Sequence, residues 1–268
     1  MRQRRRFHFV VTLLALSLNA LTSVAIAGPA SESATSATIL LYHRFGPVVA
    51  DSMTVTTAVF ASQLKYLHDN RYTIVPLRDV MNFAAGHGEL PPRAVAITAD
   101  DGHRTVFSDM KPLVERYRIP VTLFIYPSAI SNASYAMTWE QLAELKATGL
   151  FSVESHTYWH PNFRIEKRRL SAEAYGKFVD GQLSKSRQVL ERRLGGHVTM
   201  LAWPFGIYDD ELIAAAAKSG YVAAFTIERH KVSRGDKLMA LPRFIVANGD
   251  VGKRFESLLP AQTPVTNR

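Results

Sequence analysis

Two short stretches of the chain hold residue types that bind metal ions. Residues 153–161 read VESHTYWHP, with His156 and His160 four positions apart. Residues 98–102 read TADDG, with two adjacent carboxylates. Two histidines at this spacing can converge on one ion, either on a helix face or where a strand runs into a loop. A catalytic zinc site needs about three protein ligands, so the histidines need a further ligand from elsewhere.

The adjacent acids Asp100 and Asp101 suit that need. Two like charges side by side disfavour double ionisation unless a cation compensates them, and a divalent metal is such a cation. Asp101 can bind the metal together with His156 and His160, while Asp100 points the other way and stays free as a base. The alternative is that the acidic pair caps a helix predicted to begin at residue 106. The two histidines favour the metal interpretation.

The elements that must position these residues alternate between strands and helices. We predict strands at 38–42, 72–75, 94–99, 121–126, 151–154, 199–203, 222–227 and 242–246. We predict helices at 57–69, 77–85, 106–118, 139–148, 170–194 and 209–219. This alternation is typical of an α/β fold with a largely parallel sheet, and a distorted (β/α) barrel of seven or eight units is the simplest architecture.

An open, doubly wound sheet is the alternative architecture. No predicted strand is followed by GxGxxG or GxxxxGK[ST], so nucleotide binding has no support. In a barrel, the carboxyl ends of the strands share one mouth, where active sites lie. The polar and aromatic residues at these ends are His43, Asp100, Asp101, Tyr126, His156, His160, Trp203 and Phe205. We therefore expect them to meet at one site.

The first 27 residues have the pattern of a secretory signal peptide, with four arginines, an apolar run and an Ala-Ile-Ala cleavage site. A retained membrane anchor is the alternative. Removing this segment leaves 32 − 4 = 28 basic residues against 23 acidic ones, a formal charge of +5. This excess is moderate and forms no basic stripe, so nucleic-acid binding is not expected. Without cysteine, the fold must be held by its core.

The domain organisation predicted from these features is simple. We predict a signal peptide at 1–27, a linker at 28–37, one catalytic domain at 38–256 and a C-terminal tail at 257–268. No second long apolar run follows the signal, so no stable membrane span is expected after its cleavage. We expect an exported monomer, either periplasmic or secreted.

Three motifs resemble those of the polysaccharide deacetylases with NodB homology, carbohydrate esterase family 4. TADDG (98–102) is similar to the family's TFDDG, SHTYWHP (155–161) to H-[ST]-x-x-H, and LAWPFG (201–206) to R-x-P-[YF]-G. The motifs follow the family's order, and the resemblance covers residues 38–246. It implies a hydrolase that removes N-acetyl groups from an N-acetylhexosamine polymer. The implied cofactor is a divalent metal, zinc first, with nickel, cobalt or iron fitting the same ligands.

The resemblance also implies a role for individual residues. Asp100 matches the catalytic base, and the backbone N–H of Phe205 matches the donor to the oxyanion. The residues that match the family's metal ligands are Asp101, His156 and His160. In the family mechanism a metal-bound water, deprotonated by the base, attacks the acetamide carbonyl, and an acid protonates the leaving amine.

Two departures from the family pattern affect these assignments. The arginine of the third motif, which braces the catalytic aspartate in many members, is replaced by Ala202. The family's late histidine has no match, because no histidine follows His230. His43, in LLYHRF (40–45), can supply the general acid instead. An early Tyr-His and a WPYG-like third motif resemble the biofilm branch, the poly-β-1,6-N-acetylglucosamine de-N-acetylases.

Trp203 and Tyr126 are the candidate sugar-binding residues, with core packing the alternative for the tryptophan. Two other functions remain open from the sequence. The same metal site could cleave O-acetyl esters on another polysaccharide. Because Ala202 replaces the family arginine, the chain could also be a carbohydrate-binding pseudoenzyme without turnover.

Overall fold

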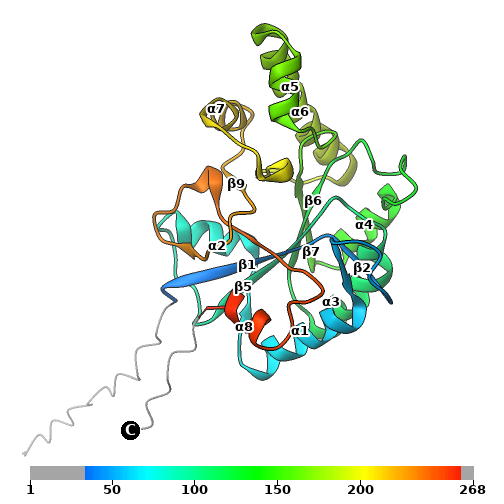
Figure 1. Ribbon diagram of the computed structural model, residues 1–268. Coiled ribbons are helices and arrows are strands. Elements are labelled where there is room, and N and C mark those ends of the chain that lie inside the picture. The colour runs from blue at the N-terminus through cyan, green and yellow to red at the C-terminus, as the bar shows by residue number, and fades with distance from the viewer. Residues whose placement is uncertain (1–33, 261–268) are drawn as a thin grey trace, which may run out of the picture. The chain divides into compact units, whose positions relative to one another are not determined.

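The computed structural model describes residues 34–260 (Figure 1). The predicted signal peptide, most of the predicted linker and residues 261–268 lie outside the described residues. Between residues 34 and 260, no helix is both long enough and apolar enough to span a bilayer.

A nine-stranded sheet forms the centre of the fold. Its main order is β10-β1-β5-β6-β7-β8-β9, with β11 paired to β1 and β4 paired to β5. The strands are β1 (Ser36–Tyr42), β4 (Thr73–Ile74), β5 (Ala94–Asp100), β6 (Val121–Ile125), β7 (Phe151–Ser155), β8 (Met200–Ala202), β9 (Ala223–Phe225), β10 (Val232–Ser233) and β11 (Phe244–Ile245). Every pair is parallel except β1 with β10. All eight predicted strands are present, to within two residues at each end.

The segment 241–246 closes the gap between the two ends of the curled sheet. Leu241 bridges to Phe225 of β9, and Phe244 of β11 pairs with Leu40 of β1. The N–H of Val246 donates to the carbonyl oxygen of Leu41, at 2.9 Å. This short closure, in place of a full strand, makes the α/β fold a distorted barrel, as predicted.

Helices connect successive parallel strands, and all six predicted helical segments are present. They are α1 (Thr57–Asp69), α2 (Leu77–Ala84), the π-helical turn η1 (Val106–Met110) with α3 (Lys111–Tyr117), α4 (Trp139–Ala147), α6 (Ala172–Leu194) and α7 (Asp210–Lys218). Thr138 caps α4 in a capping box with Gln141. The predicted helix 106–118 begins as a π-turn because Pro112 lacks an N–H and its ring crowds the carbonyl four residues earlier.

Several short elements were not predicted. They are β2 (Arg44–Gly46), β3 (Thr54–Thr56), the strand β10 already given, α5 (Phe163–Arg169), α8 (Lys253–Leu258) and the 3₁₀ turns η2 (Pro204–Gly206) and η3 (Leu238–Ala240). Elements of two to seven residues are too short to show a hydrophobic period. α8 crosses the predicted start of the tail at residue 257, and Leu258 and Leu259 are buried. The packed chain therefore continues past that predicted boundary.

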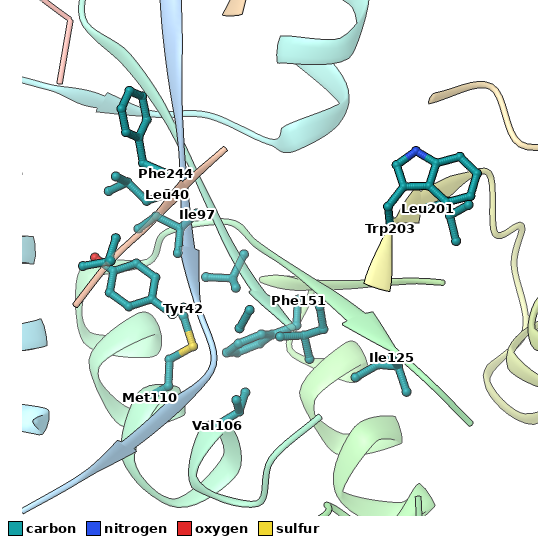
Figure 2. Packing of buried hydrophobic residues seen from close by; sticks show 14 of the residues in the cluster. Leu40, Tyr42, Ile97, Val106, Met110, Ile125, Phe151, Leu201, Trp203 and Phe244 are labelled. Carbon is teal, nitrogen blue, oxygen red and sulfur yellow. The ribbon is translucent and has the colours of Figure 1, made fainter. Parts of the chain in front are cut away.

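The strands are buried on both faces. On one face, Leu40, Ile97 and Leu201 belong to the larger hydrophobic cluster (Figure 2). Their chain neighbours Ile39 and Ala96 belong to a second cluster on the opposite face. Because alternate residues of a strand point in opposite directions, burial of both faces requires the nearly continuous apolar runs seen in the sequence.

Candidate active site

One cavity of about 540 Å³ collects all eight residues that the sequence singled out. They are His43, Asp100, Asp101, Tyr126, His156, His160, Trp203 and Phe205. Four further lining residues, Arg44, Met53, Ile227 and Ile245, were not predicted. Most of the lining residues end or follow β1, β5, β6, β7, β8, β9 and β11, so the cavity lies at the carboxyl ends of the strands, as expected for a barrel.

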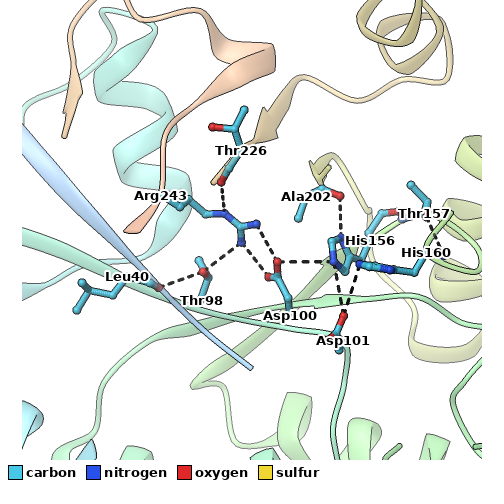
Figure 3. Close-up of polar contacts among 11 residues, drawn as sticks. Leu40, Thr98, Asp100, Asp101, His156, Thr157, His160, Ala202, Thr226 and Arg243 are labelled. Carbon is cyan, nitrogen blue, oxygen red and sulfur yellow. Dashed lines mark hydrogen bonds and ion pairs between the residues drawn. The ribbon is translucent and has the colours of Figure 1, made fainter. Parts of the chain in front are cut away.

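Asp101, His156 and His160 have the geometry of a metal site. Their ligand atoms all lie within 4.8 Å of one another. The Oδ1 atom of Asp101 is 3.7 Å from Nε2 of His156 and 3.8 Å from Nε2 of His160 (Figure 3). Ligand atoms about 2.1 Å from a tetrahedral ion lie about 3.4 Å apart, so small movements would suffice to bind one. The three residues therefore fit a divalent ion.

The surroundings of the two histidines favour their neutral forms. Nδ1 of His156 donates to the carbonyl oxygen of Ala202 at 2.8 Å, which leaves Nε2 as the free acceptor. Burial lowers the pKa of His156 to about 3. Burial also lowers the pKa of His160. Metal ligation requires neutral imidazole, so both rings are prepared to bind a cation.

Strained backbone turns bring the ligands together. Asp101, Thr157, His160 and Phe205 have positive φ values of 72°, 64°, 61° and 55°. Such values are uncommon for residues other than glycine and persist where the surrounding structure enforces them. In the loop after β7, the Thr157 N–H donates to Oγ of Ser155, and the His160 N–H donates to Oγ1 of Thr157. This tight turn brings the two histidine rings to a centroid distance of 4.5 Å.

Asp100 forms a buried ion pair with Arg243. The guanidinium donates from Nη1 and Nη2 to the two carboxylate oxygens, each at 2.8 Å (Figure 3). Its Nε donates to the carbonyl oxygen of Thr226 at 3.0 Å, and Nη1 also reaches Oγ1 of Thr98. Burial is the largest single influence and would raise the pKa of Asp100, but the charge and hydrogen bonds of Arg243, together with the nearby His156 and His43, outweigh it and hold this pKa below its ordinary value. Asp100 is therefore ionised at neutral pH.

Arg243 was missed in the sequence, although it resolves the departure at Ala202. It lies on the closing segment 241–246, which brings it to Asp100 from 143 positions along the chain. Its signal in the sequence was a single charge inside an otherwise apolar predicted strand. A charge at such a position is buried only if a partner compensates it.

Asp101 is in the opposite electrostatic situation. Its pKa is raised, chiefly by burial and also by the neighbouring charge of Asp100, while His43 opposes the shift. A bound cation would remove this penalty, because an opposite charge favours the carboxylate. The adjacent acids thus differ: one is already compensated by an arginine, and the other faces two neutral histidines.

His43 and Phe205 occupy positions consistent with their predicted roles. His43 lies between β1 and β2, is half-buried and lines the cavity. Burial lowers its pKa, and the charges of Asp100 and Asp101 oppose that shift. The backbone N–H of Phe205 has no hydrogen-bond acceptor among the described residues. Its ring is 55% exposed and contacts the His160 ring edge-on at 4.6 Å.

The two candidate sugar-binding residues differ in exposure. Tyr126 is half-buried, with its ring 5.4 Å from that of His160 and its hydroxyl bonded to the hydroxyl of Tyr135. It forms a side wall of the cavity. Trp203 is fully buried, and its Nε1 donates to the carbonyl oxygen of Met239 at 2.9 Å. The tryptophan therefore shapes the floor of the cavity by packing and offers no free ring face to a sugar.

Several known proteins are similar to this chain in sequence and in fold. The profile of the family described as polysaccharide deacetylase matches residues 87–224. A poly-β-1,6-N-acetyl-D-glucosamine N-deacetylase of Staphylococcus epidermidis is 28% identical over 216 residues, covering 76% of this chain and 71% of that protein.

Solved structures agree on the fold. The Streptococcus pyogenes deacetylase PplD, in complex with acetate, superposes with a TM-score of 0.74 at 21% identity, over 84% of this chain and 99% of that one. IcaB from Ammonifex degensii gives a TM-score of 0.74 at 23% identity, over 84% and 97%. The profile spans more than half of the 268 residues and includes the acidic pair and both histidines. This chain therefore belongs to the polysaccharide deacetylase family.

Proposed function

We propose that the protein is a metal-dependent hydrolase that removes N-acetyl groups from an N-acetylglucosamine-containing polysaccharide of the cell wall or extracellular matrix. The observation that carries the proposal is one cavity in which an Asp-His-His cluster adjoins a second aspartate braced by a buried arginine. The cluster suits a divalent ion, and the braced aspartate suits a base. Metal-assisted hydrolysis of an amide uses both functions.

Asp101, His156 and His160 would hold the ion. When bound there, a divalent metal lowers the pKa of water and polarises a carbonyl group. Two nitrogens and one carboxylate oxygen suit zinc, and nickel, cobalt or iron accept the same ligands. Zinc is the proposed ion because it takes this ligand set in four-coordinate sites with an open position.

The remaining residues handle protons and charge. Asp100, kept ionised by Arg243, takes a proton from the water that attacks the acetyl carbonyl carbon. The backbone N–H of Phe205 donates to the carbonyl oxygen as this atom gains negative charge. The proton reaches the leaving nitrogen through His43, the C–N bond breaks, and acetate and the sugar amine are released. Asp100 and His43 thereby return to their starting states.

The substrate proposal rests on the relatives and on the cavity walls. The Staphylococcus epidermidis relative carries poly-β-1,6-N-acetyl-D-glucosamine in its name. The half-buried ring of Tyr126 and the exposed ring of Phe205 offer apolar faces of the kind that stack on sugars. We place the reaction outside the cytoplasm, either in the periplasm or after secretion. The domain organisation that we propose is a signal peptide at 1–27, a linker at 28–37 and a catalytic domain that acts as a monomer.

The pseudoenzyme alternative loses its main argument. It rested on the missing arginine at Ala202, and Arg243 now supplies a bidentate partner to Asp100. Cleavage of O-acetyl esters needs the same site and remains a possible outcome of the experiment.

The experiment compares three substrates. Purified protein is stripped with a chelator, reloaded with single metals, and assayed on N-acetylglucosamine oligomers, acetylated xylan and a chromogenic acetate ester. Amine release from the oligomers that disappears in Asp100→Asn supports the proposal. The matched control is Asp180→Asn, an exposed acid on α6 that should retain full activity. Ester cleavage without amine release would indicate an O-deacetylase, and no turnover with any metal would overturn the proposal.

A further inference from the structure

We propose that Arg44 is a substrate-positioning residue. It donates hydrogen bonds to an uncharged oxygen atom, of a hydroxyl or carbonyl group, on the sugar unit in the cavity. This inference deepens the proposed function and rests on it. Arg44 belongs to none of the three motifs that carry the family resemblance.

Arg44 lies at the reacting end of the cavity. It directly follows His43 at the start of β2, and both residues line the cavity with the acidic pair. The same cavity is lined by Tyr126 and by the histidines of the three-residue cluster. A sugar unit placed with its acetyl group at this cluster would therefore lie within the cavity that Arg44 also lines.

The side chain of Arg44 is anchored from one side. Nη1 forms an ion pair with Oδ2 of Asp51 in the loop between β2 and β3. Asp51 is itself fixed, because its Oδ1 accepts from the Met53 N–H at 3.0 Å and from Oγ1 of Thr54 at 2.9 Å. In the β2–β3 ladder, Arg44 pairs with Thr54. The guanidinium is thus preorganised, which reduces the entropy lost when a ligand binds.

Most donors of Arg44 are unused. A guanidinium carries five N–H donors and no acceptor. Among the described residues, none accepts a hydrogen bond from Nε or from Nη2. Nε is enclosed, whereas the side chain as a whole is 37% exposed, so the exposed donors belong to the terminal Nη groups. An acceptor from a molecule in the cavity would satisfy them.

The charge balance selects the kind of acceptor. Asp51 neutralises Arg44, and the site already contains the two carboxylates of Asp100 and Asp101. An anionic group on the substrate would have to compete with Asp51 for the Arg44 guanidinium. Neutral hydroxyl and carbonyl oxygens of an uncharged N-acetylated sugar fit these conditions. The alternative is that the Arg44–Asp51 pair only fastens the loop to β2.

The first test separates sugar binding from a purely structural role. In Arg44→Gln, kcat/KM on N-acetylglucosamine oligomers should fall by about 10- to 100-fold, mostly through KM, since a hydrogen bond from a charged donor is lost. Turnover of 4-nitrophenyl acetate, which lacks a sugar, should stay within about threefold. The matched control is Arg104→Gln, an arginine outside the cavity lining that donates to the carbonyl oxygen of Ser134. Equal losses on both substrates, or an unchanged KM for oligomers, would overturn the inference.

A second measurement does not require turnover, and it can be made with either of two variants of Arg44. Oligomer affinity is measured by calorimetry on metal-loaded Asp100→Asn, with and without Arg44→Gln, and a tenfold or larger weakening is expected. If Arg44→Gln fails to fold, Arg44→Lys is used instead. Lysine keeps the positive charge but lacks the planar pair of guanidinium donors, so it should weaken binding as well. If oligomer binding depends on Arg44 but the wild-type protein releases no amine with any metal, the proposed function is rejected and this inference is kept. Oligomer binding that is absent or independent of Arg44 would reject the inference.

Discussion

At the scale of single residues, the adjacent acids have different neighbours. Asp100 pairs with Arg243, and its pKa lies below the ordinary value despite complete burial. Asp101 faces His156 and His160, and burial raises its pKa. A base must be ionised without being bound to the metal, whereas a ligand gains most from the metal's charge. The different neighbours are consistent with the two roles expected from the sequence, Asp100 as the base and Asp101 as the metal ligand.

Removing Arg243 should destabilise the protein strongly. Arg243→Met leaves Asp100 buried without its counter-charge, which costs about 3–5 kcal/mol in the free energy of unfolding. Urea denaturation of the metal-free protein measures this change. Adding Asp100→Asn to Arg243→Met should recover part of the loss, because the uncompensated charge disappears. Arg229→Met, an exposed arginine, is the matched control, and equal stability of Arg243→Met and wild type would contradict the prediction.

His43→Ala should lower turnover while leaving the metal content intact. Loss of a general acid costs about 10²- to 10⁴-fold in rate, and His43 is not part of the three-residue cluster. Steady-state kinetics and elemental analysis check the two parts. His160→Ala should lose metal, and His230→Ala, an exposed histidine outside the cavity lining, should change neither. Metal loss in His43→Ala would identify this residue as a ligand instead.

At the scale of elements, α6 supports the histidine loop from behind. Oγ of Ser186 lies 2.7 Å from Oγ of Ser155, the last residue of β7. Oε1 of Gln182 accepts from the N–H of Trp159, at 3.0 Å. Trp159 directly precedes the second histidine ligand, so this contact helps to hold the loop's strained conformation. The ring of Trp159 packs edge-on against Phe178 of the same helix, with the ring centroids 5.8 Å apart.

Breaking the contact between α6 and the loop should weaken metal binding. Gln182→Leu removes the acceptor of the Trp159 N–H, so the His160 turn loses its support. Groups that orient metal ligands typically contribute about 10- to 100-fold in affinity, and we expect about tenfold here because the contact is indirect. Competition with a chromophoric chelator measures the affinity. Gln188→Leu, the same change at an exposed position of α6, is the control; the prediction fails if both variants bind metal equally.

At the scale of the whole molecule, the two ends of the described chain complete the site together. The segment 241–246 lies between β9 and β1 and carries Arg243 to Asp100 of β5. Thr38 of β1 donates through Oγ1 to the carbonyl oxygen of Leu258 in α8, at 2.7 Å. The barrel closure and the active site are thus one arrangement, and the site exists only when the C-terminal part has packed.

Metal binding should stabilise the whole domain. A ligand that binds only the folded state adds about 2.7 kcal/mol at a concentration of 100 Kd. For a domain of this size, that corresponds to a rise in Tm of about 5–10 °C. Differential scanning calorimetry before and after chelation measures it. Asp101→Asn should abolish the rise and Asp180→Asn should keep it, whereas an equal rise in both variants would place the metal elsewhere.

The sequence by itself determined the framework of this protein. Apolar runs and amphipathic stretches located eight strands and six helices. A strand that is buried on both faces needs apolar side chains at successive positions, and such a run is visible in the sequence. The chemistry at the strand ends identified the residues that the cavity brings together, including Asp101, His156 and His160. Short elements such as β2 and α5 escaped, since three to seven residues do not establish a period.

Only the tertiary structure decided which groups complete the site. Arg243 is 143 positions from Asp100, and nothing in their local sequences relates them. The burial of Trp203 and the anchoring of Arg44 by Asp51 likewise depend on how separate segments pack. Local sequence encodes periodicity and residue type, whereas ion pairs and cavity walls arise from contacts across the closed barrel. The motif TADDG therefore indicated a base, and the closing segment supplied the arginine that keeps it charged.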